Sequence, residues 1–394
     1  MFSDRLERIQ PSATLEMTAK AADLKREGKD VINLSVGEPD FNTPKNIQDA
    51  GIHAIQNGIT RYTPGGGTLD LKEAIQFKLL RDNNLEYSTD QIVVSCGGKH
   101  SLYNACQVLF QRNDEVIVFT PYWVSFPDFI SVTGAKPVFV NTLPENQNEP
   151  DFNDLKSKIN SNTKGIIINS PSNPTGGVWS NDALLQAIKI ARQHDLWIFS
   201  DECYEQLTYD KEFTSTAFLD KDFKKIVTFQ SCSKTYAMTG WRIGYIAGDK
   251  NLIKAVAKLQ GQSTSCPTSI SQHAAIEALR GSQEAVKKMK KKFHERRDFI
   301  VAKLNNMDNV SCQLPRGAFY VFPDFSYFIG KSLNGKTISS ASDIALGLLS
   351  KYFVVSVAGN SFGSDHNIRF SYALSKHDLN KAMNLLERFL QKIN

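Results

Sequence analysis

The sequence predicts an α/β protein with two domains, a large one built on a mostly parallel β-sheet and a smaller α+β one. Two observations lead to this fold class. From about residue 90 to residue 250, short β-rich runs alternate with amphipathic stretches, as in a parallel sheet that helices cover on both faces. In addition, 394 residues are too many for one compact core, so we expect a second domain.

The expected sheet strands are short, continuous apolar runs, because parallel strands are buried on both faces. In chain order they are Gln91–Ser95, Glu115–Thr120, Pro137–Val140, Gly165–Asn169, Leu196–Ser200 and Ile226–Phe229. Two amphipathic stretches predict helices between these strands, Lys99–Phe110 and Ala183–His194. The second places its apolar residues on one face: Leu184, Leu185, Ile188 and Ala191.

The carboxyl-terminal third predicts the α+β unit. Helical patterns resume at Asn251 and again over Glu284–Leu304. Two later runs, Arg316–Phe322 and Phe353–Ala358, have the composition of strands, and a closing helix is expected near Asp378–Ile393. The chain shows no internal repeat, low-complexity segment or flexible linker.

Charge and composition argue against a nucleic-acid-binding protein. The formal net charge is +5, with 41% hydrophobic and 22% charged residues, which is ordinary for a globular protein. The one basic run, Lys287–Lys292, lacks interleaved aromatic residues, so we interpret it as a solvated helix face.

The sequence also predicts neither a membrane protein nor a metal site. The amino terminus lacks the apolar region of a signal peptide, and no apolar stretch nears the ~20 residues that a membrane span needs. The seven histidines have no ligand spacing, and the cysteines form no Cys-x-x-Cys pair. Such scattered cysteines are typical of the reducing cytosol, so we expect a cytoplasmic protein. They are residues 96, 106, 203, 232, 266 and 312.

Candidate functional residues follow the expected strands. In open α/β sheets, ligands bind outside the carboxyl ends of the strands. Small, polar and aromatic residues lie at several of these ends, which indicates one shared site. They are Gly97 and Gly98, Trp123, Asn173, Asp201, and the segment Ser231 to Lys234.

The segment Phe229–Tyr245 carries the most specific chemistry. It follows an apolar strand and sets Lys234 among Ser231, Ser233, Arg242 and several glycines. A lysine amine can form a Schiff base with an aldehyde, and the serines and the arginine suit a phosphate. Pyridoxal 5'-phosphate (PLP) needs both features. The alternative is a surface lysine.

This segment resembles the lysine-attachment signature of the class I PLP-dependent aminotransferases, and the resemblance covers nearly the whole chain. It is greatest to the bacterial-type aspartate aminotransferases of that class. The similar segments are Pro11–Thr14, Gly37–Phe41, Gly97–Lys99, Pro121–Ser125, Asn169–Gly176, Ser200–Tyr204, Phe229–Tyr245 and Arg369–Tyr372. The resemblance implies the fold type I of PLP-dependent transferases. It also implies a large PLP-binding domain over residues 45–290 and a small domain of residues 1–44 and 291–394.

By this resemblance, three residues are catalytic. Lys234 binds the cofactor and then moves a proton between the substrate Cα and the cofactor. Asp201 holds the cofactor's ring nitrogen protonated, and Tyr204, with Asn173, donates to its phenolate oxygen, which keeps Lys234 basic near neutral pH. Asp201 could instead cap a helix, and Asn173 could be a turn residue before Pro174.

The remaining cofactor contacts involve the phosphate and the ring. We expect the phosphate at the start of the helix that Gly97, Gly98 and Lys99 open, where unpaired backbone N–H groups favour an anion. Ser231, Ser233 and Arg242 complete this phosphate site. Trp123 resembles the aromatic residue that stacks on the ring, although an isolated tryptophan is more often a core residue.

Substrate contacts follow from the same resemblance. Arg369 matches the arginine that pairs with the α-carboxylate, and Gly37 matches a backbone contact to it, with Trp123 and Asn173 nearby. Lys99 matches a lysine for the distal carboxylate of aspartate and glutamate. Tyr62 resembles a tyrosine that reaches the phosphate of the neighbouring subunit, which implies a homodimer with shared active sites.

We therefore expect an aminotransferase with ping-pong kinetics that moves the amino group of aspartate or glutamate to a 2-oxo acid such as 2-oxoglutarate. Relatives that use prephenate have a lysine just before the segment equivalent to Pro11–Thr14. This chain has Gln10 there, so we expect weak activity on prephenate. The alternatives are an aromatic or kynurenine-type aminotransferase or a C–S β-lyase on the same fold. A cofactor-sensing module of a regulator is disfavoured, because no DNA-binding domain precedes residue 11.

Overall fold

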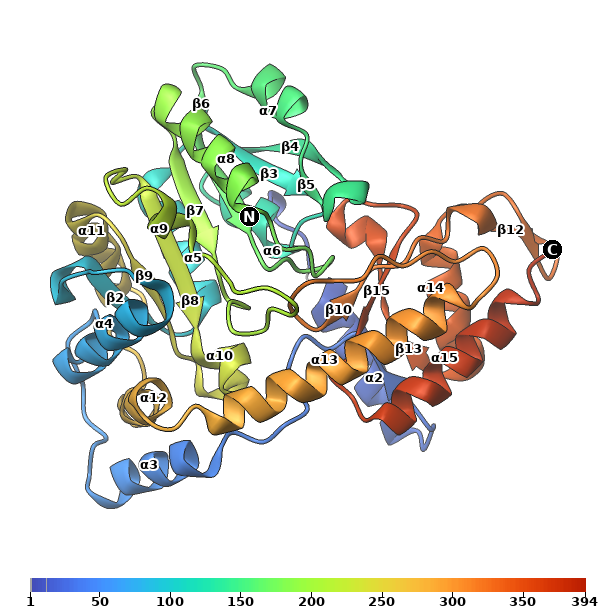
Figure 1. The fold of residues 1–394 in the computed structure, drawn as a ribbon, viewed down its shortest axis with the longest axis horizontal. Helices are drawn as coiled ribbons and strands as arrows, with labels where there is room; N and C mark the ends of the chain where they lie inside the picture. Colours follow the sequence, from blue (N-terminus) through green and yellow to red (C-terminus); the bar gives the residue numbers. More distant parts are fainter. Residues whose placement is uncertain (1, 12) are drawn as a thin grey trace.

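An eight-stranded sheet forms the core of the larger part of the molecule (Figure 1). The computed structural model describes residues 2–11 and 13–394. Met1 and Ser12 lie outside the described residues, and Ser12 belongs to the Pro11–Thr14 segment singled out above. The strand order is β2-β9-β8-β7-β6-β3-β4-β5. The strands are β2 (Ile92–Ser95), β3 (Glu115–Thr120), β4 (Lys136–Leu143), β5 (Glu149–Pro150), β6 (Thr163–Asn169), β7 (Trp197–Asp201), β8 (Ile226–Ser231) and β9 (Gly244–Ala247).

The central strands are parallel, as the sequence predicts. Strands β4, β3, β6, β7 and β8 form a continuous parallel set. Strand β9 is antiparallel to both of its neighbours, β8 and β2, so β2 points in the same direction as β8. Strand β5 is an antiparallel edge strand beside β4. All six predicted strands form, and the predicted α/β class is confirmed.

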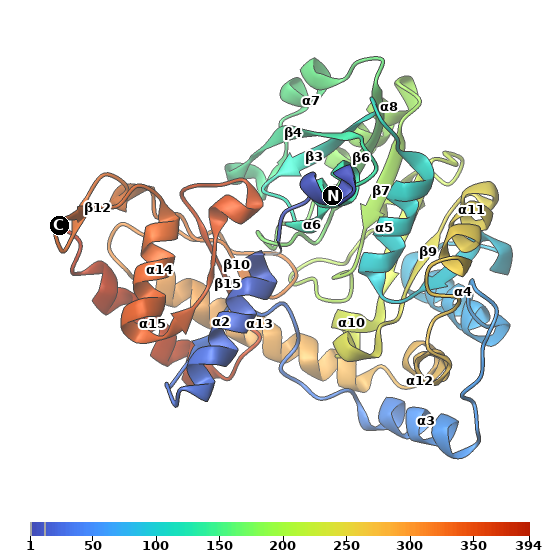
Figure 2. The same ribbon diagram turned by 180° about the vertical axis from the view of Figure 1, so that it is seen from behind.

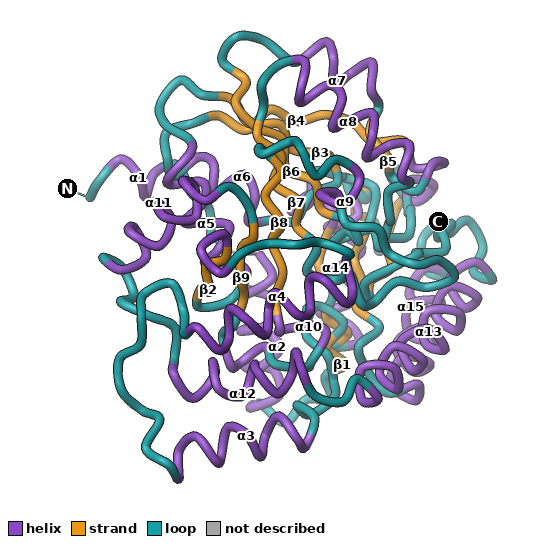
Figure 3. The backbone as a smooth tube through the Cα atoms, turned by 60° about the vertical axis from the view of Figure 1, so that its left-hand side comes forward, coloured by secondary structure: helices purple, strands orange, loops and turns teal. Residues whose placement is uncertain are grey.

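Helices cover both faces of the sheet (Figures 2 and 3). Successive residues of one strand serve the two faces: Ile166 and Ile168 of β6 pack in one apolar cluster and Ile167 in another. The first cluster includes residues of α4 (Leu69–Asn83), α8 (Asn181–Gln193) and α12 (Ser269–Arg280). The second includes residues of α5 (Gly98–Leu109), α6 (Ser125–Ser131) and α11 (Lys250–Gly261).

Both ends of the chain contribute to the smaller part, where the blue helix α2 lies among the red and orange elements (Figures 1 and 2). Strand β1 pairs in parallel with β13, and β10, β15 and β14 form an antiparallel sheet. The elements are α2 (Ala13–Arg26), β1 (Ile32–Asn33), α13 (Glu284–Asn305), β10 (Tyr320–Val321), β11 (Ser332–Leu333), β12 (Lys336–Thr337), α14 (Ala341–Tyr352), β13 (Val354–Val355), β14 (Val357–Ala358), β15 (Ile368–Ser371) and α15 (Lys376–Leu390).

The long helix α13 runs from beside α12 into the smaller part (Figure 1). It crosses residue 290, the expected end of the large domain, without a break. The division into residues 45–290 and residues 1–44 with 291–394 stays a prediction. The other helices are α1 (Asp4–Glu7), α3 (Lys45–Gln56), α7 (Phe152–Lys158), α9 (Thr216–Leu219) and α10 (Cys232–Thr235).

Two expected strands of the smaller part are shorter than predicted. Of the run Arg316–Phe322, only Tyr320–Val321 is a strand, because Ala318 has a φ of +56° that breaks the extended backbone. The run Phe353–Ala358 divides into β13 and β14, which join different sheets. No helix in the described part is both long and apolar enough to cross a lipid bilayer.

Candidate active site

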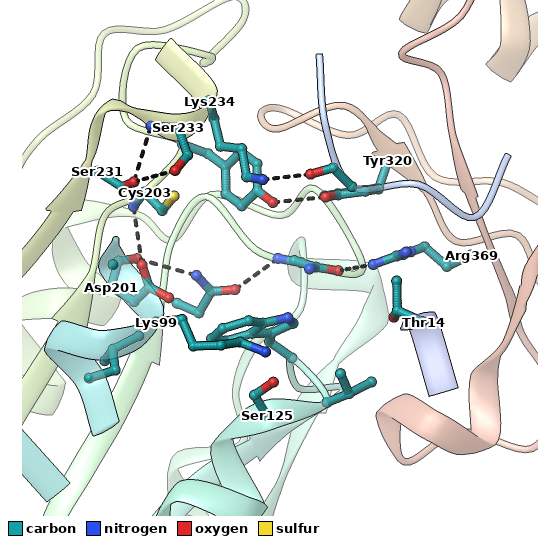
Figure 4. Close-up of a pocket in the computed structure, with 18 of the residues that line it drawn as sticks. Thr14, Lys99, Ser125, Asp201, Cys203, Ser231, Ser233, Lys234, Tyr320 and Arg369 are labelled. Carbon is teal, nitrogen blue, oxygen red and sulfur yellow. Dashed lines mark hydrogen bonds between the residues drawn. The ribbon is translucent and has the colours of Figure 1, made fainter. Parts of the chain in front are cut away.

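A cavity of about 460 Å³ opens at the edge of the large sheet where its parallel strands end, facing β10 and β15 of the smaller part (Figure 4). Asp201 is the last residue of β7, and Ser231 is the last residue of β8. Gly98 follows β2 and Trp123 follows β3. Since these strands point the same way, their carboxyl ends bring the four residues to one edge.

Lys234 enters the cavity from α10, which begins directly after β8. The Ser231 side chain caps this short helix by accepting the backbone N–H of Ser233 at 3.1 Å, and its hydroxyl also donates to the Ser233 hydroxyl at 2.8 Å. The Lys234 Nζ donates to the carbonyl oxygen of Gly37 at 2.5 Å. Burial lowers the pKa of Lys234, so a neutral, nucleophilic amine forms more readily.

Asp201 is a buried carboxylate in the wall of the same cavity. One of its oxygens accepts the backbone N–H of Cys203 at 3.2 Å. Burial raises the pKa of Asp201 to about 7, while the Cys203 N–H and Lys234 oppose the rise. A turn rather than a helix follows at residues 203–206. The helix-cap alternative for Asp201 therefore has no helix to cap.

The backbone at the start of α5 lies next to the guanidinium of Arg242. Gly97, the N-cap residue, has a φ of +91°, which favours glycine, and α5 begins at Gly98. A Cβ on Gly97 would lie only 2.4 Å from Nη2 of Arg242. Arg242 reaches this place because Gly244 at the start of β9 pairs with both Ser95 and Ser231. The helix N-terminus, the guanidinium and the Ser231 and Ser233 hydroxyls thus converge on one corner of the cavity.

Arg369 lies in the wall formed by the smaller part. Its Nη1 donates to Asn173 Oδ1 at 2.8 Å and its Nη2 to the Ser35 carbonyl at 2.6 Å. Its Nε has no hydrogen-bond partner among the described residues, although the side chain is only 1% exposed. Burial lowers the pKa of Arg369. An unsatisfied, buried guanidinium N–H beside a cavity is suited to a carboxylate ligand.

Lys99 adds a further cation next to Trp123. Its Nζ lies 5.0 Å from the centroid of the Trp123 ring, within cation–π range. Burial, followed by the nearby Arg242, lowers the pKa of Lys99, and Asp128 opposes the shift. The ammonium is therefore held by an aromatic face and retains hydrogen-bond donors for a ligand.

The balance of charge predicts an anionic ligand. Four basic side chains line the cavity, Lys99, Lys234, Arg242 and Arg369, whereas Asp201 is the one carboxylate among the described lining residues. Because these charges are close together and partly desolvated, ligands with several negative charges would relieve their repulsion. A phosphate and a carboxylate supply such charges.

The structure brings twelve of the fourteen predicted site residues to the cavity wall. They are Gly37, Gly98, Lys99, Trp123, Asn173, Asp201, Tyr204, Ser231, Ser233, Lys234, Arg242 and Arg369. Gly97 lies immediately behind, as the N-cap of α5. Tyr62 does not line the cavity and is 90% exposed, as a residue would be that reaches into another subunit.

Several lining residues were not predicted. Thr14, Ser125, Asn169 and Cys203 lie within the segments that carry the resemblance, so their motif membership was the available signal. Tyr320 belongs to an expected strand, and its local sequence gives no sign that it faces a ligand. Its position depends on the pairing of β10 with β15, which joins segments about fifty residues apart.

Comparison with known proteins gives the family. The model of the aminotransferase class I and II family matches residues 29–386. The chain belongs to the class I and II aminotransferases. It is 43% identical over 393 residues to the aspartate aminotransferase of Bacillus subtilis strain 168, covering 99% of each chain. It is 42% identical to a probable aspartate/prephenate aminotransferase of Rhizobium leguminosarum, covering 98% of each.

Solved structures agree with this assignment. The aminotransferase superposes on the crystal structure of the aspartate aminotransferase from Rhizobium meliloti with a TM-score of 0.96, at 38% identity and full coverage of both chains. The predicted resemblance and the predicted fold are thereby confirmed.

Proposed function

We propose that this enzyme transfers the amino group of aspartate or glutamate to a 2-oxo acid such as 2-oxoglutarate, using pyridoxal 5'-phosphate. The observation that carries the proposal is that one cavity brings together the Lys234 amine, the Asp201 carboxylate, a helix N-terminus with Arg242, and Arg369, whose Nε–H has no partner among the described residues. When bound, PLP supplies an aldehyde that bonds to amines and a ring that takes up electrons from the substrate Cα. The name of the Bacillus subtilis relative supports the choice of aspartate.

The residues present fit this cofactor. The corner formed by the start of α5, Ser231, Ser233 and Arg242 would hold the phosphate, because it combines backbone N–H groups with a guanidinium. Asp201 would pair with the ring nitrogen, since a buried carboxylate whose pKa is raised to about 7 is stabilised as an anion by a neighbouring proton donor. Trp123 would lie against the ring.

In this proposal, Lys234 carries the proton. The Lys234 amine is buried and its pKa is lowered by that burial, so it can take a proton from the substrate Cα and return one near neutral pH. Tyr204 would donate a hydrogen bond to the ring oxygen of the cofactor, together with Asn173. The Gly37 carbonyl, which accepts from the Lys234 Nζ at 2.5 Å, restricts where that amine can lie.

Arg369 and Lys99 would bind the two carboxylates of the substrate. Arg369 is fixed by two hydrogen bonds and is buried near the Tyr320 and Phe362 rings, whose centroids lie 4.6 and 5.0 Å from its Cζ. Such preorganisation reduces the entropy lost when a carboxylate binds. Lys99 would bind the distal carboxylate, which distinguishes aspartate and glutamate from monocarboxylic amino acids.

We also propose a homodimer with shared active sites. Tyr62 is exposed, and several apolar side chains near it in the chain are exposed as well. Exposed apolar side chains gathered on one segment are typical of an interface. These are Ile52, Ile55, Ile59 and Leu69.

The proposal is tested by trapping the cofactor and by single-turnover measurements. Borohydride reduction of the PLP-loaded enzyme, followed by peptide mapping, should label Lys234. The Lys234→Ala variant should lose transamination but still bind PLP through its phosphate contacts. Labelling of another lysine would reject the assignment.

The choice among substrates is tested by mixing the loaded enzyme with single amino acids and following cofactor absorption. Aspartate and glutamate should convert the cofactor to its amino form fastest. A faster reaction with aromatic amino acids or kynurenine, or the release of a thiol from cystathionine-type substrates, would favour the alternative activities. Prephenate should serve poorly as an acceptor, because Gln10 replaces the expected lysine.

A further inference from the structure

Tyr320 lines the cavity, although no sequence motif predicted it as a site residue. It lies on β10, where it pairs with Ser371 of β15. Because side chains alternate along a strand, Tyr320 and Arg369 lie on the same face of this small sheet. Only 1% of the Tyr320 side chain is exposed, and Figure 4 shows it at the cavity beside the end of Lys234.

Tyr320 contacts three of the groups assigned above. Its hydroxyl lies 2.8 Å from the hydroxyl of Tyr204. Its ring lies 4.6 Å from the Cζ of Arg369. A Cβ on Gly37 would lie 2.7 Å from the Tyr320 hydroxyl oxygen, so glycine at residue 37 leaves the room that this hydroxyl occupies. Gly37 thus holds Lys234 through its carbonyl oxygen and leaves space for Tyr320.

The chemistry of the two side chains indicates which phenol donates in the Tyr204–Tyr320 hydrogen bond. Each phenol has one proton to donate. If Tyr204 directs its proton at a ligand in the cavity, the Tyr204 oxygen is left to accept from Tyr320. Burial raises the pKa of Tyr320 and raises that of Tyr204 well above its usual value, and the nearby Arg369 opposes the rise at both. Tyr320 is therefore the better donor of the pair.

We propose that Tyr320 is a positioning residue whose hydroxyl donates to Tyr204 and thereby directs the Tyr204 proton at the cofactor's ring oxygen. The inference rests on the proposed function. Two successive hydrogen bonds of this kind polarise one another, so the donation by Tyr204 is strengthened. The same hydrogen bond restrains the Tyr204 ring, which packs edge-on against Tyr320 at 5.8 Å between centroids.

The test is the Tyr320→Phe variant of the PLP-loaded enzyme. The hydrogen bond to the ring oxygen stabilises negative charge there, so a weaker donor raises the pH at which the bound cofactor changes its absorption. We expect the absorption midpoint to rise by about 0.5–1 pH unit, which is the pKa shift that corresponds to the net free energy of one hydrogen bond. The turnover number should fall, while the KM for aspartate changes little, because the phenylalanine ring still packs on Arg369.

A double-mutant cycle separates this role from a general structural one. In the Tyr204→Phe background, Tyr320→Phe should cause no further shift of the absorption midpoint. A shift that persists in that background would overturn the inference, as would an unchanged midpoint in the single variant. The matched control is Tyr372→Phe, which also loses a buried hydroxyl bond, 3.0 Å to the Ala318 carbonyl, outside the cavity. It should leave the midpoint unchanged.

A second variant covers the case in which Tyr320→Phe folds poorly. Incorporation of 3-fluorotyrosine at position 320 keeps the hydrogen bond and makes the donor more acidic, so the midpoint should move downward. An unchanged or raised midpoint would overturn the inference. If the wild-type enzyme shows no PLP absorption that depends on Lys234, the proposed function fails and the inference fails with it. A normal wild-type titration with an unaffected Tyr320→Phe variant rejects the inference alone.

Discussion

At the scale of single residues, the site contains two ionisable groups whose charged forms are disfavoured by burial. Asp201 is 6% exposed and its pKa is raised to about 7 by burial. Lys234 is half-buried, and desolvation lowers the pKa of its amine. Each is costly to ionise in the protein without a partner, and a ligand that supplies the partner changes that cost. Because ionising Asp201 is costly without a ligand, the stability of the cofactor-free protein should change with pH in a predictable direction.

The prediction concerns Asp201 in the cofactor-free protein. Its pKa is higher in the folded state than the usual 3.8, so its contribution to stability is present below about pH 4 and is lost as the pH rises through about 7. Asp201→Asn should remove this loss and stabilise the protein at pH 8 by at most about 4 kcal/mol. Denaturant unfolding between pH 4 and 8 measures it. The control variant Asp182→Asn, at an exposed residue, should leave the pH dependence of the unfolding free energy unchanged. If Asp201→Asn showed the same pH dependence as the wild-type protein, the raised pKa of Asp201 would be contradicted.

Lys99 gives a prediction about substrate preference. Lys99→Ala removes the ammonium that we assign to the distal carboxylate, so the KM for aspartate should rise about tenfold or more, as expected for a charge-assisted hydrogen bond. The KM for alanine, which has no distal carboxylate, should change little. Steady-state kinetics with both donors provides the measurement. Equal increases for aspartate and alanine would show that Lys99 does not recognise the second carboxylate.

At the scale of elements, a buried polar network supports the segments that carry the site. Lys78 of α4 forms an ion pair with Glu205, which directly follows Tyr204, and donates to Gln230, which directly precedes Ser231, at 2.7 Å. Glu205 also accepts from Asn83 and Gln230, at 2.6 and 2.9 Å. The network thus ties α4 to the turn after β7 and to the end of β8.

We expect Lys78→Met to destabilise the fold by about 3–5 kcal/mol, because it leaves a buried carboxylate without its cation. The double variant Lys78→Met with Glu205→Leu should recover part of this loss, since both charges are removed. Chemical denaturation measures each. Lys45→Met, which breaks an exposed ion pair with Asp49, should cost less than about 1 kcal/mol. If Lys78→Met destabilised the fold as little as Lys45→Met, the buried Lys78–Glu205 ion pair would not be needed for stability.

Sequence patterns predicted the central strands because buried parallel strands are continuous apolar runs, as Glu115–Thr120 shows. They did not predict β9, since Gly244–Ala247 begins inside the lysine segment Phe229–Tyr245 and its antiparallel pairing is a long-range property. The site residues that follow strands were predicted because strand ends converge. Tyr320 was not, because neither the break at Ala318 nor the pairing with β15 is encoded in a local period.

At the scale of the whole molecule, the proposed dimer can be tested by complementation. If Tyr62 serves the partner's site, the Tyr62→Ala and Lys234→Ala substitutions fall in the same site of a mixed dimer, so the other site stays intact. Co-expression of the two should restore about a quarter of wild-type activity, since half of the dimers are mixed. Mixing Lys234→Ala with Arg369→Ala should restore none, because both residues line the cavity of their own chain. Failure of the first mixture to regain activity would argue against shared sites.

The walls of the cavity come from distant parts of the chain, from Thr14 and Gly37 to Tyr320 and Arg369. This arrangement has a consequence for biosynthesis. A growing polypeptide that ends before β15 already contains Asp201 and Lys234, yet it lacks Arg369, the guanidinium that we assign to the α-carboxylate. If Arg369 binds the α-carboxylate as proposed, the ribosome must release nearly the entire chain before the protein can capture a substrate. The α-carboxylate contact would then be the last part of the described cavity wall to be synthesised.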